Sequence, residues 1–400
     1  MHRNTNNKYA NKLQDITNHI CEYVERTLDY RIIENNETYG LLTGNFGILI
    51  FLAYITKHNK SYESLYNRFL DYNLNAVSTK LLSPDFCSGI SGIISAISFM
   101  NRNNLCDVDI SEFEKAYEKH LYMNMIRSFA IEKYDYFYGG IGVALCFLNN
   151  LYYNSIYESY IEDSISILRK VAIEQNNMLK WKTSFTQNTQ YTYNISISHG
   201  ISSIIIFLCK CHIHGFNCKD MIQKGVEYIL SQELKFEEIG SCFPSISKEC
   251  EKTLQKSRLG WCYGDLGISI ALLWAGKVLH NELFINKAKD IIALSVLRRE
   301  YKDTFVDNPF ICHGAAGLAC IYYNFNDVLK IKGIDDAGDF WLNKCIEFGN
   351  NQNGVAGYIL NEKHSTNDIY SILNGITGVG LTLLFHLYND TDWTEFILLK

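Results

Sequence analysis

Two cysteines and a histidine in this chain have the residue types and the spacing of a metal site. Cys262 lies in the segment Gly-Trp-Cys-Tyr-Gly, two places before Gly264, and Cys312 lies two places before Gly314. His313 follows Cys312 directly. Because both glycines open the pattern Gly-x-x-Gly, the two thiols occupy the same register of a repeated turn. The sequence therefore predicts that these three side chains meet at one site.

Two thiolates and one imidazole form a soft ligand set, which favours zinc over magnesium, calcium or manganese. Three protein ligands leave a fourth tetrahedral position for water or a substrate, as in catalytic zinc sites. Since two cysteinates already neutralise the charge of Zn²⁺, a third thiolate, from a substrate, would give an anionic complex that stays nucleophilic. We therefore expect one Zn²⁺ that activates a thiol. A metal-free, hydrogen-bonded polar cluster at the same place is the alternative.

The turn that carries these residues recurs along the whole chain. Its first glycines are 45, 50, 61, 64, 50 and 61 residues apart. They are Gly44, Gly89, Gly139, Gly200, Gly264, Gly314 and Gly375. An apolar run follows nearly every copy, so each repeat should hold a polar-faced outer helix, a loop ending in the turn, and an inner helix that is apolar nearly all round. Seven repeats predict an all-α toroid of seven outer and seven inner helices, with residues 1–400 as one domain.

Two segments are longer than this plan requires and are expected to be excursions from the ring. Residues 174–197 and 234–258 precede the fourth and fifth turns, where the spacings are 61 and 64 residues. Aromatic or β-branched residues partly alternate with polar ones over 180–197, which predicts a short β-hairpin. Both segments are candidates for loops that face a substrate.

The position directly before the first glycine also carries polar side chains, which should face the centre of such a ring. It holds His199 in the fourth turn, Tyr263 in the fifth and His313 in the sixth. A histidine pKa near 6.5 suits general acid–base work. His199 is therefore a candidate acid or base beside the proposed ligands, with a satisfied core histidine as the alternative.

Composition narrows the function classes. The net charge is −6 and no block rich in Lys and Arg is present, which argues against a nucleic-acid partner because phosphate binding needs a concentrated basic surface. The polar N-terminal segment lacks the apolar core of a secretory signal, and apolar runs fall short of the roughly 20 residues that span a membrane. Thirteen cysteines, an odd number at irregular spacing, fit reduced thiols. We expect a cytoplasmic protein.

Taken together, these motifs resemble the lanthionine synthetase C-like family, in particular the stand-alone cyclases of class I lantibiotic biosynthesis. The resemblance rests on Trp-Cys-Tyr-Gly at 261–264, Cys-His-Gly at 312–314, Ser-His-Gly at 198–200 and the seven glycine turns. It covers essentially the whole chain. It implies the α/α toroid, one zinc ion on the three ligands named above, and an enzyme that forms lanthionine and methyllanthionine rings. Such enzymes add peptide cysteine thiolates to dehydroalanine or dehydrobutyrine in a Michael addition.

The resemblance also assigns roles that spacing alone does not. Family members carry an aspartate four places before the third turn and an arginine four places before the cysteine of Trp-Cys-Tyr-Gly; here these are Asp135 and Arg258. The implied mechanism uses His199 as acid or base, Asp135 to orient its ring and Arg258 to stabilise an enolate. Tyr263 is a further donor candidate. Taken alone, Asp135 fits a helix cap equally well, and Arg258 fits a solvated loop charge.

The chain departs from the family pattern at two turns. Ser203 replaces the second glycine of the fourth turn. Asp265 and Leu266 follow Trp-Cys-Tyr-Gly, where serine and proline are common in the family. Neither change touches a proposed ligand.

The implied substrate is a dehydrated precursor peptide with its leader. The implied partners are a dehydratase and a transporter in a membrane-associated complex, which would place the protein peripherally at the inner face of the cell membrane. Two other functions stay open: a related protein that binds or adds a small thiol such as glutathione, and a metal-free binding scaffold. An α/α-barrel glycosidase is disfavoured, since the turn positions offer no facing pair of carboxylates.

Overall fold

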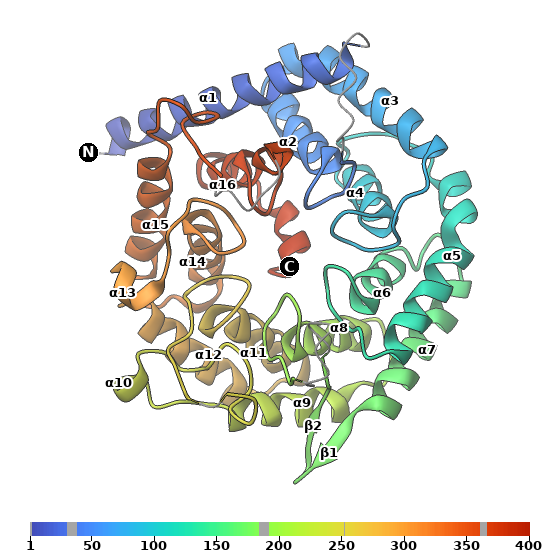
Figure 1. Ribbon diagram of the computed structural model, residues 1–400, viewed down its shortest axis with the longest axis vertical. Helices are drawn as coiled ribbons and strands as arrows, with labels where there is room; N and C mark the ends of the chain where they lie inside the picture. The colour runs from blue at the N-terminus through green and yellow to red at the C-terminus, as the bar shows by residue number, and fades with distance from the viewer. Residues whose placement is uncertain (1, 30–37, 184–191, 252, 361–365) are drawn as a thin grey trace. The chain divides into compact units, whose positions relative to one another are not determined.

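Helices make up most of the described part of the chain. The structure, a computed structural model, describes residues 2–29, 38–183, 192–251, 253–360 and 366–400 (Figure 1). Seven helices each precede a glycine turn: α1 (His2–Leu28), α3 (Glu63–Thr79), α5 (Ser111–Ala130), α7 (Ile156–Val171), α9 (Lys219–Ser231), α12 (Glu282–Ser295) and α15 (Ile334–Phe348). Seven more follow directly: α2 (Asn45–His58), α4 (Ile90–Arg102), α6 (Gly140–Asn149), α8 (Ile201–Ile213), α11 (Asp265–Leu279), α14 (Ala315–Leu329) and α16 (Ile376–Tyr388).

The two sets of helices differ in burial, as the sequence pattern predicts. Every residue from 201 to 209 in α8 is buried, as are those from 376 to 385 in α16. By contrast, α7 and α9 bury one stripe and expose the rest to solvent. The expected alternation of polar-faced and fully apolar helices, seven of each, is therefore present in the described residues.

The glycines of the turns permit a close approach of backbone to backbone. A Cβ atom on Gly317 would lie 2.0 Å from the carbonyl oxygen of Ile311, a distance at which no side chain fits. Gly264 has a φ of 83°, which favours glycine, and a Cβ there would lie 2.5 Å from the carbonyl oxygen of Arg258. In the fourth turn Ser203 takes the second glycine's place, and its Oγ donates to the carbonyl of Gly200 at 2.9 Å.

Contacts within the chain define two compact units, each with its own packing. In the unit formed by residues 1–117, 308–324 and 335–400, α16 packs against α1 and α2, and α2 packs against α3 and α4. In the unit formed by residues 118–307 and 325–334, α8 packs against α6, α9 and α11, and α11 packs against α12. The single domain over residues 1–400 stays a prediction.

The first excursion contains β structure. A hairpin of β1 (Ile173–Gln175) and β2 (Met178–Lys180), paired antiparallel, precedes most of the 180–197 segment in which the alternation predicts a hairpin. An isolated bridge pairs Thr183 with Thr192, and the expected residues 184–191 lie outside the described part of the chain. Short helical turns complete the fold: η1 (Lys60–Tyr62), α10 (Phe236–Ile239), α13 (Tyr301–Thr304), η2 (Thr366–Tyr370) and η3 (Asp392–Ile397).

A buried ion pair anchors the second excursion to the turn that carries Cys262. The carboxylate of Asp265, at the start of α11, accepts hydrogen bonds from the backbone N–H groups of Cys242 and Phe243 and from Arg298 Nη1, at 2.9–3.1 Å. Arg298 also donates to the carbonyl of Ser257 at 2.7 Å. Burial raises the pKa of Asp265, an effect that Arg298 and the backbone donors oppose. This network fixes residues on both sides of Cys262.

Replacing Arg298 should destabilise the protein strongly. Arg298→Ala leaves the carboxylate of Asp265 buried without its cation, which typically costs about 3–5 kcal/mol in the free energy of unfolding. The matched control is Arg68→Ala, because Arg68 pairs with Glu25 and both side chains are about half exposed. Such an exposed pair contributes at most about 1 kcal/mol. Thermal and urea unfolding measure both; equal losses in the two variants would contradict the prediction.

Candidate active site

The three residues predicted to bind a metal form a cluster. The Sγ atoms of Cys262 and Cys312 and a ring nitrogen of His313 all lie within 4.8 Å of one another. Both cysteines are buried, and His313 is partly exposed. Ligand atoms around a tetrahedral zinc ion lie roughly 3.3–3.8 Å apart when the bonds are about 2.0–2.3 Å long. The donor types therefore suit a zinc-like ion.

Backbone hydrogen bonds between successive turns fix the position of Cys312. The N–H of Cys312 donates to the carbonyl of Leu373 at 3.0 Å, and the N–H of Leu373 donates to Leu42 at 3.2 Å. The N–H of Leu42 in turn donates to Cys87 at 2.9 Å. All four residues lie two places before the first glycine of their turns. The sixth, seventh, first and second turns are thus joined in one register.

A second set of contacts fixes Cys262. The carbonyl of Ser198 accepts a hydrogen bond from the N–H of Tyr136 at 3.1 Å, which joins the third and fourth turns. The Oγ of Ser198 donates to the carbonyl of Cys262 at 3.3 Å and accepts from its Sγ at 2.9 Å. The third, fourth and fifth turns are therefore joined through Ser198, which is fully buried.

Asp135 both closes its own turn and holds the ring of His199. Its Oδ1 accepts hydrogen bonds from the N–H groups of Phe137 and Tyr138 at 2.7 and 2.8 Å. Its Oδ2 forms a short hydrogen bond with Nδ1 of His199. The two readings of Asp135, as a cap and as a partner of His199, are therefore compatible. The hydrogen bond to Asp135 thus fixes the orientation of the ring through Nδ1.

The surroundings of His199 favour its protonated form. Burial lowers its pKa, but hydrogen bonds and charge interactions with Asp135 and Cys262 outweigh burial and raise it to about 9. The ring of Phe137 contacts the imidazole edge-to-face at 5.4 Å between centroids. Tyr263 lies at 6.1 Å by the same measure and is partly exposed. His199 is thus a positioned, proton-holding group whose side chain is 14 % exposed.

Arg258 lies in the loop before Cys262 and pairs with Asp307. Its Nη1 lies 3.3 Å from Oδ1 of Asp307, and the two side chains are 31 % and 52 % exposed. The N–H of Leu259 donates to the carbonyl of Thr304 at 2.9 Å, which fixes the backbone next to Arg258. The pair is open enough for the guanidinium to change partner, so its role toward a substrate stays a prediction.

Comparison with known protein families identifies the family of this chain. A family model described as lanthionine synthetase C-like protein matches residues 1–122 and 107–399. The chain belongs to this family.

Two relatives of the family show how far the similarity extends. The chain is 26% identical to nisin biosynthesis protein NisC of Lactococcus lactis subsp. lactis, over 95% of this chain and 93% of that protein. Its structure is similar to that of nisin cyclase, with a TM-score of 0.74 and 22% identity, over 96% of this chain and 97% of the other. The all-α toroid fold predicted from the sequence is therefore confirmed.

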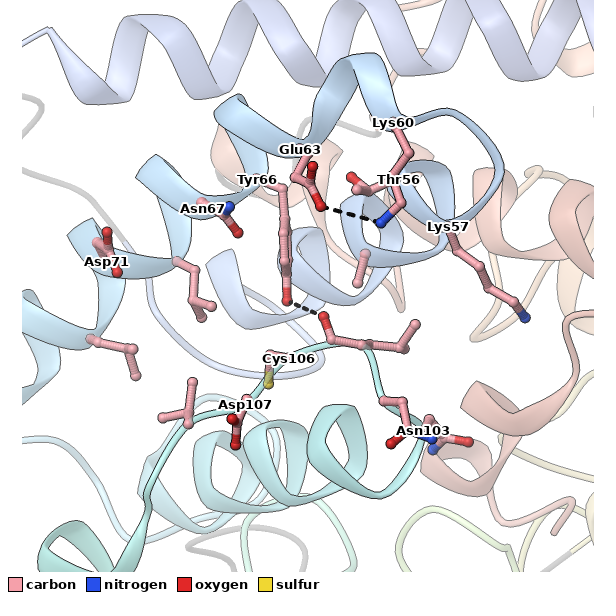
Figure 2. Close-up of a pocket in the computed structure, with 16 residues that line it drawn as sticks. Thr56, Lys57, Lys60, Glu63, Tyr66, Asn67, Asp71, Asn103, Cys106 and Asp107 are labelled. Atoms are coloured by element: carbon pink, nitrogen blue, oxygen red, sulfur yellow. Dashed lines mark hydrogen bonds and ion pairs between the residues drawn. The ribbon is translucent and has the colours of Figure 1, made fainter.

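The fold also contains a polar cavity that the family resemblance did not predict. It has a volume of about 590 Å³ and lies at the C-terminal ends of α2 and α4, whereas the glycine turns lie at their N-terminal ends (Figure 2). Side chains of both charges line it, including Lys57, Asp71 and Asp107. The ion pair of Lys60 with Glu63 borders it. None of the candidate site residues is among the described residues that line it.

Two contributors to the site were not predicted from the sequence. Ser198 holds the same register as Cys262 and Cys312, two places before a first glycine, and that position was the available signal. The pairing of Asp265 with Arg298 has no such signal, because the two residues are 33 places apart in different elements.

Among the described residues, no helix combines the length and apolar character that crossing a membrane requires.

The contact between Asp135 and His199 predicts a change in pKa. In Asp135→Asn the carboxylate that favours imidazolium is lost, so burial is opposed only by Cys262 and the pKa of His199 should fall well below about 9. In the wild-type protein the ring should hold its proton up to about pH 9 and lose it above. Imidazole ¹⁵N chemical shifts followed against pH, in chelator-treated protein, measure both values. An unchanged pKa in Asp135→Asn would show that Asp135 does not hold the proton.

Proposed function

We propose that this protein is a lantibiotic cyclase that forms lanthionine and methyllanthionine rings in a dehydrated precursor peptide. The observation that carries the proposal is the Cys262, Cys312 and His313 cluster, in the chain that also carries the His199–Asp135 pair. Membership of the lanthionine synthetase C-like family supports it, as does the similarity to a nisin biosynthesis protein and to a nisin cyclase.

The chemistry of the proposal follows from the donor set and the acid–base pair. A zinc ion bound by the three ligands would lower the pKa of an incoming peptide thiol, which is about 8.5 when free. His199, which holds its proton at neutral pH, can deliver that proton to Cα; to take the thiol proton it would first have to lose its own. The sulfur bonds to Cβ of the dehydro residue, the alkene electron pair moves to an enolate, and protonation of Cα completes the ring. No atom is gained or lost overall.

Donors near the enolate oxygen would stabilise its charge. Arg258 offers a permanent cation, and Tyr263 offers a hydroxyl close to His199. Asp135 fixes which nitrogen of His199 faces the reaction. These assignments separate the residues that bind the thiol from those that move protons.

The partners follow from the substrate. A precursor peptide must be dehydrated before its cysteines can add, so a dehydratase acts first, and the finished peptide needs a transporter. We therefore propose a complex of cyclase, dehydratase and transporter at the inner face of the membrane.

The direct test is incubation of the purified protein with dehydrated precursor peptide that retains its leader. Loss of free thiols without a change in peptide mass supports cyclisation. An adduct with added glutathione would instead support a small-thiol transferase, and unchanged thiols would contradict the proposal. Metal analysis of the active protein should give about one zinc per chain.

Removal of one ligand should abolish metal binding and activity together. Cys312→Ala leaves two ligands, so zinc content and ring formation should both fall, turnover by at least about a hundredfold. Cys87→Ala is the matched control, since Cys87 is buried and holds the same register in the second turn. Metal analysis and thiol titration of the product measure the outcome. Full activity of zinc-free Cys312→Ala would disprove the role of the metal.

Loss of His199 should affect turnover alone. His199→Asn removes the acid–base group but no proposed ligand, so zinc content should stay and turnover should fall about 10²- to 10⁴-fold. His212→Asn is the control, because His212 lies at the end of α8 and its Nδ1 contacts the carbonyl of Phe216. Normal cyclisation by His199→Asn would refute the acid–base assignment.

A further inference from the structure

Ser198 lies two places before the first glycine of the fourth turn, which is the position that Cys262 holds in the fifth turn. The residues two places before the first glycine in the fourth, fifth and sixth turns are Ser198, Cys262 and Cys312. Two of these three are proposed metal ligands, and the third is a fully buried hydroxyl. Its Oγ lies 2.9 Å from Sγ of Cys262, within hydrogen-bond distance of the sulfur.

The hydrogen bond between Sγ of Cys262 and Oγ of Ser198 must reverse its direction when Cys262 binds a metal. In the structure the thiol of Cys262 donates to Ser198 Oγ, and the hydroxyl proton of Ser198 points at the carbonyl of Cys262 at a longer 3.3 Å. A metal-bound cysteine has no sulfur proton. The contact at 2.9 Å can then persist only if the hydroxyl of Ser198 turns and donates to the thiolate.

We infer that Ser198 is a positioning residue that holds the Cys262 thiolate through an O–H···S hydrogen bond and reduces the electron density it gives to the metal. The inference rests on the proposed function. Charge-assisted hydrogen bonds of this kind are stronger than neutral ones, and groups that orient a ligand typically contribute 10- to 100-fold to metal affinity. The hydroxyl thus offsets part of the negative charge that two cysteines bring.

The position of Ser198 also restricts how Cys262 can move. Its carbonyl accepts from Tyr136, next to Asp135, and its neighbour in sequence is His199. The hydrogen bond to Cys262 therefore ties the metal ligand to the same dipeptide that carries the acid–base group. A shift of one group would move the other.

The test compares Ser198→Ala with Ser198→Thr, which keeps the hydroxyl, and with Ser202→Ala as a matched control. Ser202 is equally buried on the same turn, but its Oγ donates to the carbonyl of Ile195 at 2.6 Å and not to sulfur. Each protein is stripped with a chelator. The thiolate-to-metal charge-transfer band is recorded with Co²⁺, and the affinity for Zn²⁺ is measured against a chromophoric chelator. Circular dichroism checks folding, and Ser198→Gly is a second hydroxyl-free variant if Ser198→Ala does not fold.

The expected result is specific to the hydroxyl. Ser198→Ala should bind Zn²⁺ about 10- to 100-fold more weakly and shift the Co²⁺ band to lower energy, because a thiolate without its donor gives up electrons more easily. Ser198→Thr should restore both values, and Ser202→Ala should match the wild type. If Ser198→Ala keeps the Co²⁺ charge-transfer band and the Zn²⁺ affinity of the wild type, the inference is overturned and the proposed function stays intact. A wild-type protein with no thiolate band would overturn both.

Discussion

The close approach of backbone segments at the glycine turns is the constraint on which the site depends. At Gly317 there is no room for even one Cβ atom beside the carbonyl of Ile311. The same close approach allows the N–H groups of one turn to reach the carbonyl groups of another, as Cys312 reaches Leu373. Register is thereby set by the backbone and not by the side chains, which are free to carry chemistry.

Asp135 shows how one side chain can serve the fold and the site together. One carboxylate oxygen binds the two N–H groups that open the third turn, and the other binds His199. The first contact holds the carboxylate in place before any substrate arrives. In the proposed proton transfer the second contact would need no reorganisation, which is the condition under which such a pair is most effective. The raised pKa of His199 follows from this arrangement.

The parts of the structure that the sequence predicted are those set by local pattern. Seven turns and the buried helices after them follow from glycine spacing and apolar runs, and the shared register of Cys262 and Cys312 follows from counting residues. The β1–β2 hairpin was not predicted, since its strands of three residues are too short for alternation to show, whereas the antiparallel bridge of Thr183 with Thr192 lies inside the segment where a hairpin was expected. The pairing of Asp265 with Arg298 could not be found, because it depends on two loops meeting around one buried carboxylate.

The turn register also explains why a cysteine in the right place is not by itself a ligand. Cys87 lies two places before Gly89, as Cys262 does before Gly264, and it is fully buried. The turns before and after it carry Leu42 and Phe137 at that register, so no second donor comes from those positions. A buried cysteine outside a set of donors usually behaves as a small core residue. The proposed metal site would need donors at this register in consecutive turns, and the fifth and sixth turns carry cysteines there.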